Sequence, residues 1–269
     1  MRDKDFIKSF GKGFAILELM GKSEKPLSLT EIANQLGYNK TATQRFLYSL
    51  VNLGYAKKTE GKRYSLGYKV LSLGVNFQRS DKLYTLAQPY LEDLSNRLQR
   101  SLTLGVLDDT EVLIIYRKEL KRFFPYAIYA GSKMPAHCSS TGKVLLAGLP
   151  DSELDRLLDR MPLPALTPKT KIRKGDLVKE VQKIRRRGYA VSDQEFSLDL
   201  YAIGFPILDQ ESRVAAALTV SINVAEKKNK KLLESVRNSL IETCRFISKG
   251  LGYEGPYPAF YWQEALPSS

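Results

Sequence analysis

The chain has 269 residues, 43% of them hydrophobic, and its 42 Lys and Arg against 29 Asp and Glu give a net charge of +13. This length accommodates two domains with separate cores, and the composition excludes a largely disordered chain. We find no apolar run of about 18 residues and no secretory leader, so we expect a cytoplasmic protein without a membrane partner. Two Cys residues are too few for a disulfide framework or a Cys-rich metal site.

The positive charge is concentrated in the first part of the chain. Residues 1–80 contain 14 Lys and Arg against 6 Asp and Glu, whereas residues 81–269 contain 28 against 23. A basic domain suits a nucleic acid, because binding releases the counterions of the phosphates. A basic surface also improves solubility, so the charge does not decide the function by itself.

Three helices are predicted before residue 54. The first runs from Phe10 to Met20, the second is capped by Thr30 and ends at Gly37, and Asn39 caps the third. Their inward-facing residues are expected to be Phe10, Phe14, Ile16, Leu17, Met20, Ile32, Ala33, Leu36, Ala42, Phe46, Leu47, Leu50, Val51 and Leu53.

The opposite face of the third helix carries only side chains that form hydrogen bonds. Thr41, Gln44, Arg45 and Tyr48 follow the spacing i, i+3, i+4 and i+7 of one helix side. A short helix, a tight turn and a second helix with a polar face are typical of a helix-turn-helix, whose second helix enters the major groove. Gln pairs there with adenine and Arg with guanine, so Gln44 and Arg45 are expected to read bases.

A basic hairpin is predicted next, from Tyr55 to Leu66, with its turn at Glu60-Gly61. Its exposed residues are expected to be Lys57, Lys58, Lys62 and Arg63. Such a hairpin acts as a wing, and these residues, with Thr41 and Tyr48, are expected to position phosphates. The alternative is an ordinary packing corner with solvated charges.

A linker helix is predicted from Tyr68 to Phe77, with Val70, Leu71, Leu73 and Phe77 apolar. It either joins two domains and pairs with a second chain, or simply starts the next domain.

The rest of the chain alternates helices with antiparallel hairpins, which predicts an α+β domain whose sheet can hold a small molecule. Helices are predicted over 83–98, with a kink or restart at Pro89 and Tyr90 buried, over 151–158, capped by Asp151 or Ser152, over 174–187 and over 226–249. Strands are predicted over 101–107, 111–117, 123–129, 189–192, 201–208 and 213–221. Between them a helix begins near Ser140, and its unpaired N–H groups and positive dipole end favour a carboxylate.

Several motifs resemble transcriptional regulators of the IclR family. They are Phe14–Leu19, Leu27–Ala33, Leu50–Tyr55 and Tyr64–Gly67 in the first domain, and 188–195, 202–204 and 207–209 in the second. The resemblance covers about residues 8–250. It implies a winged helix-turn-helix domain over 1–67, a linker helix over 68–80, and an α+β effector-binding domain with an antiparallel sheet over 81–252. A tail over 253–269 falls outside it.

The resemblance implies contacts in both domains. Operator DNA is expected to contact Ser28, Thr30, Lys40, Thr41, Thr43, Gln44, Arg45, Tyr48, Lys57, Lys58, Lys62 and Arg63. An effector is expected to contact Ser140, Thr141, Ser192, Ala202, Thr219 and Ser221, with Tyr126, Met134 and His137 lining a ring. Arg117 either reaches the carboxylate of the effector or lies in a surface ion pair.

The loop from Met134 to Ser140 and the triplet Asp193-Gln194-Glu195 are similar to those of the subgroup that controls protocatechuate and 4-hydroxybenzoate catabolism. An aromatic acid is therefore the expected effector, and a small aliphatic acid of the glyoxylate or pyruvate type is the alternative. We expect a homodimer or tetramer on a palindromic operator, with no cofactor and no metal.

Two other classes of protein were compared with this interpretation. An enzyme using His137 and Cys138 is disfavoured, because adjacent residues do not form a dyad by themselves and the chain has a single His. No glycine-rich phosphate loop is present. A DNA-compacting protein would carry Lys and Arg on the exposed helix face, where this chain has Thr41, Gln44, Arg45 and Tyr48.

Overall fold

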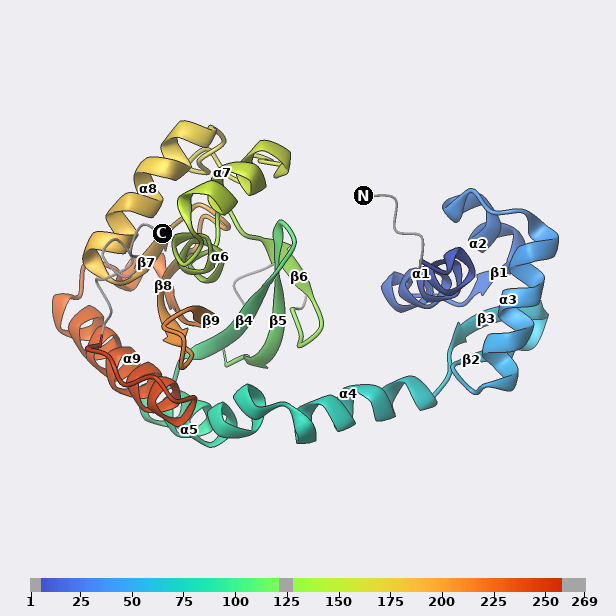
Figure 1. Cartoon of the computed structure of the whole chain (residues 1–269), viewed down its shortest axis with the longest axis horizontal. Helices are drawn as coiled ribbons and strands as arrows, with labels where there is room; N and C mark the ends of the chain where they lie inside the picture. The colour runs from blue at the N-terminus through green and yellow to red at the C-terminus, as the bar shows by residue number, and fades with distance from the viewer. Residues whose placement is uncertain (1–5, 121–127, 258–269) are drawn as a thin grey trace. The chain divides into compact units, whose positions relative to one another are not determined.

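The computed structural model describes residues 6–120 and 128–257 (Figure 1). The chain divides into two compact units, residues 1–80 and 81–269. Among the described helices, none combines the length and the apolar character needed to cross a bilayer.

The first unit contains the expected helices and a small antiparallel sheet. In chain order its elements are α1 (Lys8–Lys22), β1 (Leu27–Ser28), α2 (Leu29–Leu36), α3 (Lys40–Asn52), β2 (Ala56–Thr59), the 3-10 turn η1 (Glu60–Lys62), β3 (Arg63–Leu66) and α4 (Lys69–Ser80). The strand order is β1-β3-β2, so the hairpin gains a third strand that the sequence pattern does not predict. The three helices α1, α2 and α3 pack around Ile16, Ile32 and Leu47, which are fully buried.

Local caps fix both ends of α2 and the start of α3. The Ser28 hydroxyl accepts from the N–H of Glu31 at 3.2 Å, and the Glu31 carboxylate accepts from the N–H of Ser28 at 2.6 Å. The predicted cap at Thr30 is therefore wrong, because Thr30 already lies inside the helix. Gly37 ends α2 with a φ of 65°, and Asn39 caps α3, as predicted.

Three apolar residues predicted for this core are exposed instead. Phe10 and Phe14 of α1 and Leu53 after α3 each have more than half of their surface accessible. Phe10 and Phe14 lie about 120° around α1 from the buried Ile16 and Met20, so only one of its apolar stripes packs. The predicted linker helix forms as α4, and it contains no buried residue.

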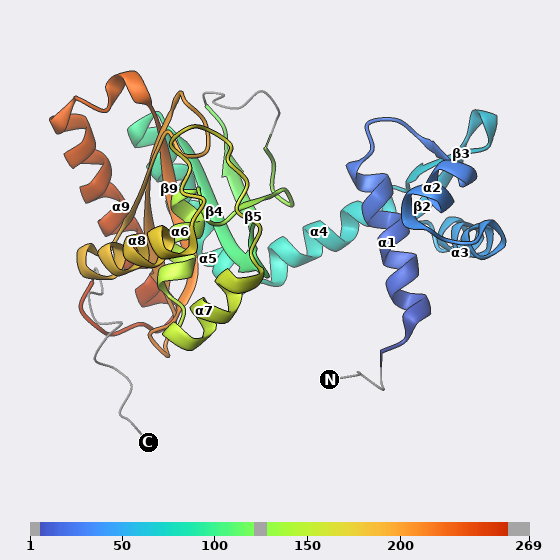
Figure 2. The same cartoon turned by 90° about the horizontal axis from the view of Figure 1, so that it is seen from above.

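The second unit is a six-stranded antiparallel sheet with helices on both faces (Figure 2). Its elements are α5 (Lys82–Leu98), β4 (Ser101–Asp108), β5 (Glu111–Lys118), β6 (Lys133–Pro135), α6 (Ser140–Ala147), α7 (Asp151–Arg160), α8 (Lys174–Arg187), β7 (Ala190–Asp193), β8 (Leu200–Leu208), β9 (Val214–Asn223), η2 (Val224–Glu226) and α9 (Lys230–Gly250). The strand order is β6-β5-β4-β9-β8-β7. The predicted α+β architecture is confirmed.

The two faces of this sheet carry different residues. Large apolar residues such as Phe205 and Leu218 point toward α5 and α9. Their neighbours along the same strands, such as Gly204 and Thr219, point toward α6, on which α8 packs. This division follows from the period of two in a β-strand. It places the small and polar residues of the sheet beneath α6.

The helices of this unit differ from the predictions in detail. Pro89 lies inside a continuous α5, and Tyr90, predicted to be buried, is 39% exposed. Neither Asp151 nor Ser152 caps α7, since Pro150 occupies the cap position and provides no side-chain hydrogen bond. The last helix begins later than predicted, because η2 takes the residues before it.

Candidate functional sites

The exposed face of α3 holds the four polar residues predicted there. Thr41, Gln44, Arg45 and Tyr48 are all exposed, and Tyr48 has 70% of its surface accessible. Within the described part of the chain, these four side chains form no hydrogen bond or ion pair with the protein. They are therefore available to a partner outside the chain.

The other predicted contacts before the wing differ in exposure. Thr43 is fully buried and its hydroxyl donates to the Asn39 carbonyl at 3.0 Å, so its predicted DNA contact is wrong. The reason is its position on the side of α3 that faces the core. Lys40 at the start of α3 and Thr30 in α2 are exposed, whereas Ser28 is half-buried.

The wing formed by β2 and β3 is basic at its surface. Its exposed lysines are Lys57, Lys58 and Lys62. Arg63 instead forms an ion pair of 3.2 Å with Glu31, whose carboxylate also takes part in the cap of α2. The hydrogen bonds from Ser28, and then the charge of Arg63, lower the pKa of Glu31. Arg63 thus connects the wing to the helix-turn-helix.

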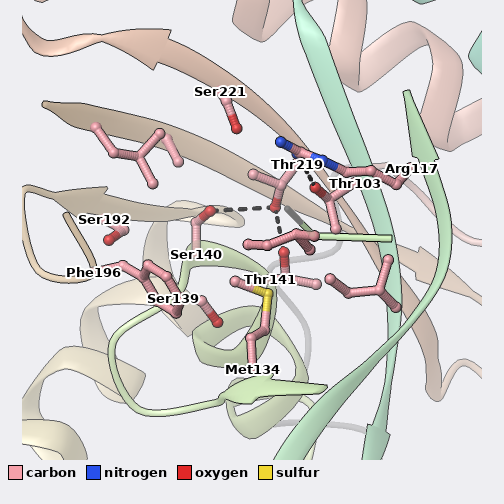
Figure 3. A pocket seen from close by; sticks show the side chains of 14 residues that line it. Thr103, Arg117, Met134, Ser139, Ser140, Thr141, Ser192, Phe196, Thr219 and Ser221 are labelled. Carbon is pink, nitrogen blue, oxygen red and sulfur yellow. Dashed lines mark hydrogen bonds between the residues drawn. The ribbon is translucent and has the colours of Figure 1, made fainter. Parts of the chain in front are cut away.

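A cavity lies between the amino end of α6 and the sheet (Figure 3). The residues that line it are Thr103, Ile114, Arg117, Ile128, Met134, Ser139, Ser140, Thr141, Ser192, Phe196, Leu200, Ala202, Thr219 and Ser221. The cavity is small. The volume that the centre of a water molecule can occupy is about 20 Å³, which is enough for about one or two waters. A larger ligand requires the lining side chains to move outward.

Hydroxyl groups join the start of α6 to the sheet. The Thr219 hydroxyl lies 3.2 Å from that of Ser140 and 2.9 Å from that of Thr141 (Figure 3). The Ser139 side chain caps the helix by accepting from the N–H of Gly142 at 3.0 Å. The N–H groups of Ser140 and Thr141 have no acceptor inside the helix, so they give this end of the cavity a partial positive charge.

Two glycines permit this close approach of α6 to its neighbours. A Cβ atom at Gly204 would lie 3.1 Å from the Ser140 carbonyl oxygen and 2.8 Å from the Thr219 hydroxyl oxygen. A Cβ atom at Gly142 would lie 2.3 Å from the backbone of Ala136. Larger residues at these two positions would push α6 away from the sheet or from the preceding loop.

Arg117 brings a guanidinium to the cavity, where it forms an ion pair with Glu119. Its side chain is 5% exposed, and it donates to the Thr103 hydroxyl at 2.7 Å and to Glu119 at 3.1 Å. Burial lowers the pKa of the guanidinium and Glu119 opposes this shift, but a guanidinium stays protonated in proteins. The surface position considered from the sequence is therefore wrong.

Comparison with known families decides what these two units are. A model described as the C-terminal domain of the bacterial transcriptional regulator IclR matches residues 77–249, which is more than half of the chain. A model of the IclR helix-turn-helix domain matches residues 9–60. The chain belongs to the IclR family.

Individual relatives of this IclR-family regulator support the same assignment. The Pca regulon regulatory protein of Pseudomonas putida is 33% identical over 244 residues, which are 90% of this chain and 84% of the relative. The p-hydroxybenzoate hydroxylase transcriptional activator of Acinetobacter baylyi is 30% identical, over 91% of this chain and 92% of that protein. The crystal structure of IclR from Thermotoga maritima has a TM-score of 0.71 and 29% identity, over 92% of this chain and 100% of that one. The predicted role as a transcriptional regulator rather than an enzyme is confirmed.

Most residues predicted to contact an effector of this IclR-family regulator lie together. The cavity is lined by Met134, Ser140, Thr141, Ser192, Ala202, Thr219 and Ser221. His137 is buried away from it, with its Nε2 atom 3.0 Å from the Pro164 carbonyl oxygen, so this candidate is wrong. Tyr126 and most of the strand predicted over 123–129 lie outside the described residues.

Sequence reasoning missed several lining residues, among them Thr103, Phe196 and Leu200. The sequence does contain a pattern that points to Thr103. Residues 101–106 are Ser-Leu-Thr-Leu-Gly-Val, and residues 217–222 are Ala-Leu-Thr-Val-Ser-Ile. Both alternate a small or polar residue with a large apolar one, which indicates strands with one unfilled face. The pairing of Thr103 with Thr219 then follows from the fold.

A buried ion pair in the IclR-family regulator lies next to the cavity. Lys143 of α6 is 1% exposed and lies 2.6 Å from Glu195, and Lys171 lies 3.0 Å from the same carboxylate oxygen. Burial is the main cause that lowers the pKa of Lys143, and Glu195 opposes it. The pair ties α6 to the segment after β7, a strand that contributes Ser192 to the cavity.

The other chemistry considered from the sequence finds no support in this region. The described residues contain no group of three His, Cys, Asp or Glu placed to bind a metal ion. Burial raises the pKa of Cys138 to about 12 and raises that of Cys244 as well. Thiols in such surroundings are poor nucleophiles.

Proposed function

We propose that this regulator reads a palindromic operator with α3 and the wing, and that a small aromatic carboxylic acid binds beneath α6 to control its activity. The observation that carries the proposal is the cavity in which seven of the predicted effector residues meet at a helix amino terminus. A protein that binds operator DNA acts where the bacterial chromosome lies, so we expect it in the cytoplasm.

The exposed face of α3 has residues suited to base contacts and residues suited to phosphate contacts. Gln44 and Arg45 lie in its middle and have the side chains that pair with adenine and guanine. Lys40, Thr41 and Tyr48, with the wing lysines Lys57, Lys58 and Lys62, are exposed around them and suit phosphates. We assign Ser28 and Arg63 to holding the motif together, because their side chains are engaged at the cap of α2.

Replacing Arg45 tests base reading. Arg45→Ala should cost roughly 1–3 kcal/mol of binding to the operator and relax base preference at one position of each half-site. Lys58→Ala is the matched control, because losing a phosphate contact weakens binding to all sequences and lowers the salt dependence. Selection from a randomised site gives the base preference. An unchanged preference would reject the role of Arg45.

Helix α4 supports assembly into a homodimer or a dimer of dimers. It buries no residue in the described chain, and Leu71, Leu73, Val75 and Phe77 are 70%, 52%, 42% and 45% exposed. Apolar surface of this extent is typical of a protein interface. A two-fold dimer would meet half-sites about 34 Å, or a multiple of this, apart. Sedimentation of the purified chain gives the oligomeric state, and a monomer at micromolar concentration would contradict the proposal.

The composition of the cavity supports an aromatic acid. The amino end of α6 and Arg117 favour an anionic group, and Phe196, Leu200 and Ala202 offer apolar surface to a ring. A relative at 30% identity is named as an activator for p-hydroxybenzoate hydroxylase. Since the free space of about 20 Å³ is too small for such a ligand, we expect the lining side chains to move when it binds, so that occupied and empty states differ in structure. That difference gives an effector the means to shift an equilibrium between DNA-binding states.

The small free space of the cavity favours one alternative, an aliphatic acid of the pyruvate or glyoxylate type. Both candidates stabilise the folded state by mass action if they bind it. We would therefore measure the melting temperature of the full chain with 4-hydroxybenzoate, protocatechuate, benzoate, pyruvate and glyoxylate. A shift with an aromatic acid that is lost in Ser221→Ala supports the proposal. A shift with only the aliphatic acids supports the alternative, and no shift with any acid rejects the cavity as an effector site.

A further inference from the structure

One row of paired residues crosses the sheet beneath α6. Arg117 on β5 pairs with Thr103 on β4, Thr103 with Thr219 on β9, and Thr219 with Gly204 on β8. Directly paired residues project from the same face of a sheet. The row therefore gathers a guanidinium and two hydroxyl groups under the first turn of α6, and Gly204 leaves room for the helix to reach them.

We propose that this row is the anion site of the effector cavity and that it sets the orientation of the ligand. The carboxylate lies between Arg117, Thr103 and the start of α6, and the rest of the molecule extends toward Ala202 and Phe196. This inference rests on the proposed function and goes beyond it, because it makes Arg117 the residue that requires the effector to be an anion.

The charge of the cavity lining supports this role. Among the described residues that line the cavity, Arg117 is the only ionisable one. A guanidinium presents several N–H groups in a planar fork that matches a carboxylate, and such charge-assisted hydrogen bonds are stronger than neutral ones. A neutral ligand such as an amide can accept a hydrogen bond from the guanidinium, but it lacks the negative charge that strengthens this bond.

The Thr103 hydroxyl can donate a hydrogen bond to a bound anion. Its oxygen accepts from Nη1 of Arg117 at 2.7 Å, so its own hydrogen points elsewhere and can be donated to a ligand. Thr219, the next residue of the row, has a hydroxyl already placed between those of Ser140 and Thr141. An anion here would receive hydrogen bonds from the sheet on one side and from the helix on the other.

The opposite side of the cavity suits the uncharged part of the ligand. Figure 3 shows Phe196 and Ser192 on the side away from Arg117 and Thr103. Ala202 on β8 pairs with Ser192 on β7 and with Ser221 on β9, and Leu200 lies two residues before it on the same strand. The cavity is thus charged at one end and mainly apolar at the other, which gives an asymmetric acid a single orientation.

Glu119 provides a second way to test the charge of Arg117. Its carboxylate accepts from Nη2 of Arg117 at 3.1 Å, and its side chain is 25% exposed. A bound carboxylate would be repelled by this neighbour, since both are negative. Removing the charge of Glu119 should therefore strengthen the binding of an acid, whereas removing the charge of Arg117 should weaken it.

The experiment is calorimetric titration of the full chain and its Arg117→Met and Glu119→Gln variants. The ligands are 4-hydroxybenzoate and pyruvate, each measured beside its neutral amide. In Arg117→Met the affinity for the acid that binds the wild type should fall about thirtyfold or more, while the affinity for its amide stays close to the wild-type value. In Glu119→Gln the acid should bind severalfold more tightly and the amide should not.

The outcomes separate this inference from the proposed function. If the wild type binds an acid and Arg117→Met binds it equally well, or loses acid and amide alike, the anion role of Arg117 is overturned while the effector site stands. If Arg117→Met does not fold, Glu119→Gln decides, and an unchanged preference for acid over amide overturns the inference. If the wild type binds neither acid, the inference and the aromatic-acid proposal both fail.

Discussion

On one face of the six-stranded sheet, Leu104, Phe205 and Leu218 are buried against α5 and α9. On the other face, their strand neighbours Thr103, Gly204 and Thr219 lie beneath α6 and leave a cavity. The same strands thus build a filled core on one side and the lining of a small cavity on the other. The two-residue period of a strand thus places the packed residues on one face and the cavity-lining residues on the other.

The largest expected effect comes from the filled face. Phe205→Ala should lower the free energy of unfolding by about 3–5 kcal/mol, because Phe205 is 1% exposed and its removal leaves a void. Thr219→Val on the other face is the matched comparison and should cost about 1 kcal/mol, since it removes hydroxyl hydrogen bonds but keeps the volume. Urea unfolding of the two variants measures both values. Equal losses would mean that the faces do not differ in their contribution to stability.

A smaller loss is expected from the buried ion pair beside the cavity. Lys143→Met should cost about 3 kcal/mol, because it leaves the Glu195 carboxylate buried with Lys171 as its remaining cationic partner among the described residues. Lys171→Met removes a contact to the same oxygen from a side chain that is 31% exposed, so it should cost less than about 1 kcal/mol. Unfolding by denaturant compares the two. A cost as small for Lys143 as for Lys171 would show that α6 does not depend on this pair.

The smallest effect concerns His137, behind the cavity. Burial is the main cause that lowers its pKa below the usual 6.5, while the Glu195 carboxylate raises it and Lys143 lowers it further. Below that pH the unfolded chain binds the proton more readily than the folded one, so stability should decline as the pH falls from about 6.5. His137→Gln should flatten this decline without changing effector affinity. Thermal melts across the pH range measure the slope, and because the chain has one His, a slope that persists in the variant would assign it to another group.

The first unit shows what local patterns predict well. The caps at Gly37 and Asn39 and the polar side of α3 follow from residue spacing within one or two turns of helix. The burial of Thr43 and the exposure of Leu53 did not follow, because they depend on the angle at which α3 meets its neighbours. Local periodicity contains no information on that angle.

The second unit shows the same limit at longer range. Ser140 and Thr219 could be predicted from a family pattern, but nothing local to residue 117 indicates that its guanidinium reaches Thr103 of β4 and lines the cavity. The pairing of Lys143 with Glu195 likewise joins residues separated by 52 positions. Such contacts depend on strand order and register, which the hydrophobic alternation of single strands does not determine.

The glycines that hold α6 in place restrict how this regulator can evolve. Gly204 and Gly142 cannot gain even a methyl group without displacing the helix. Changes that adapt the cavity to another effector are therefore expected at other lining positions, such as Arg117 and Ser192. Lineages that diverge in the compound they sense should keep these two glycines and differ at those positions.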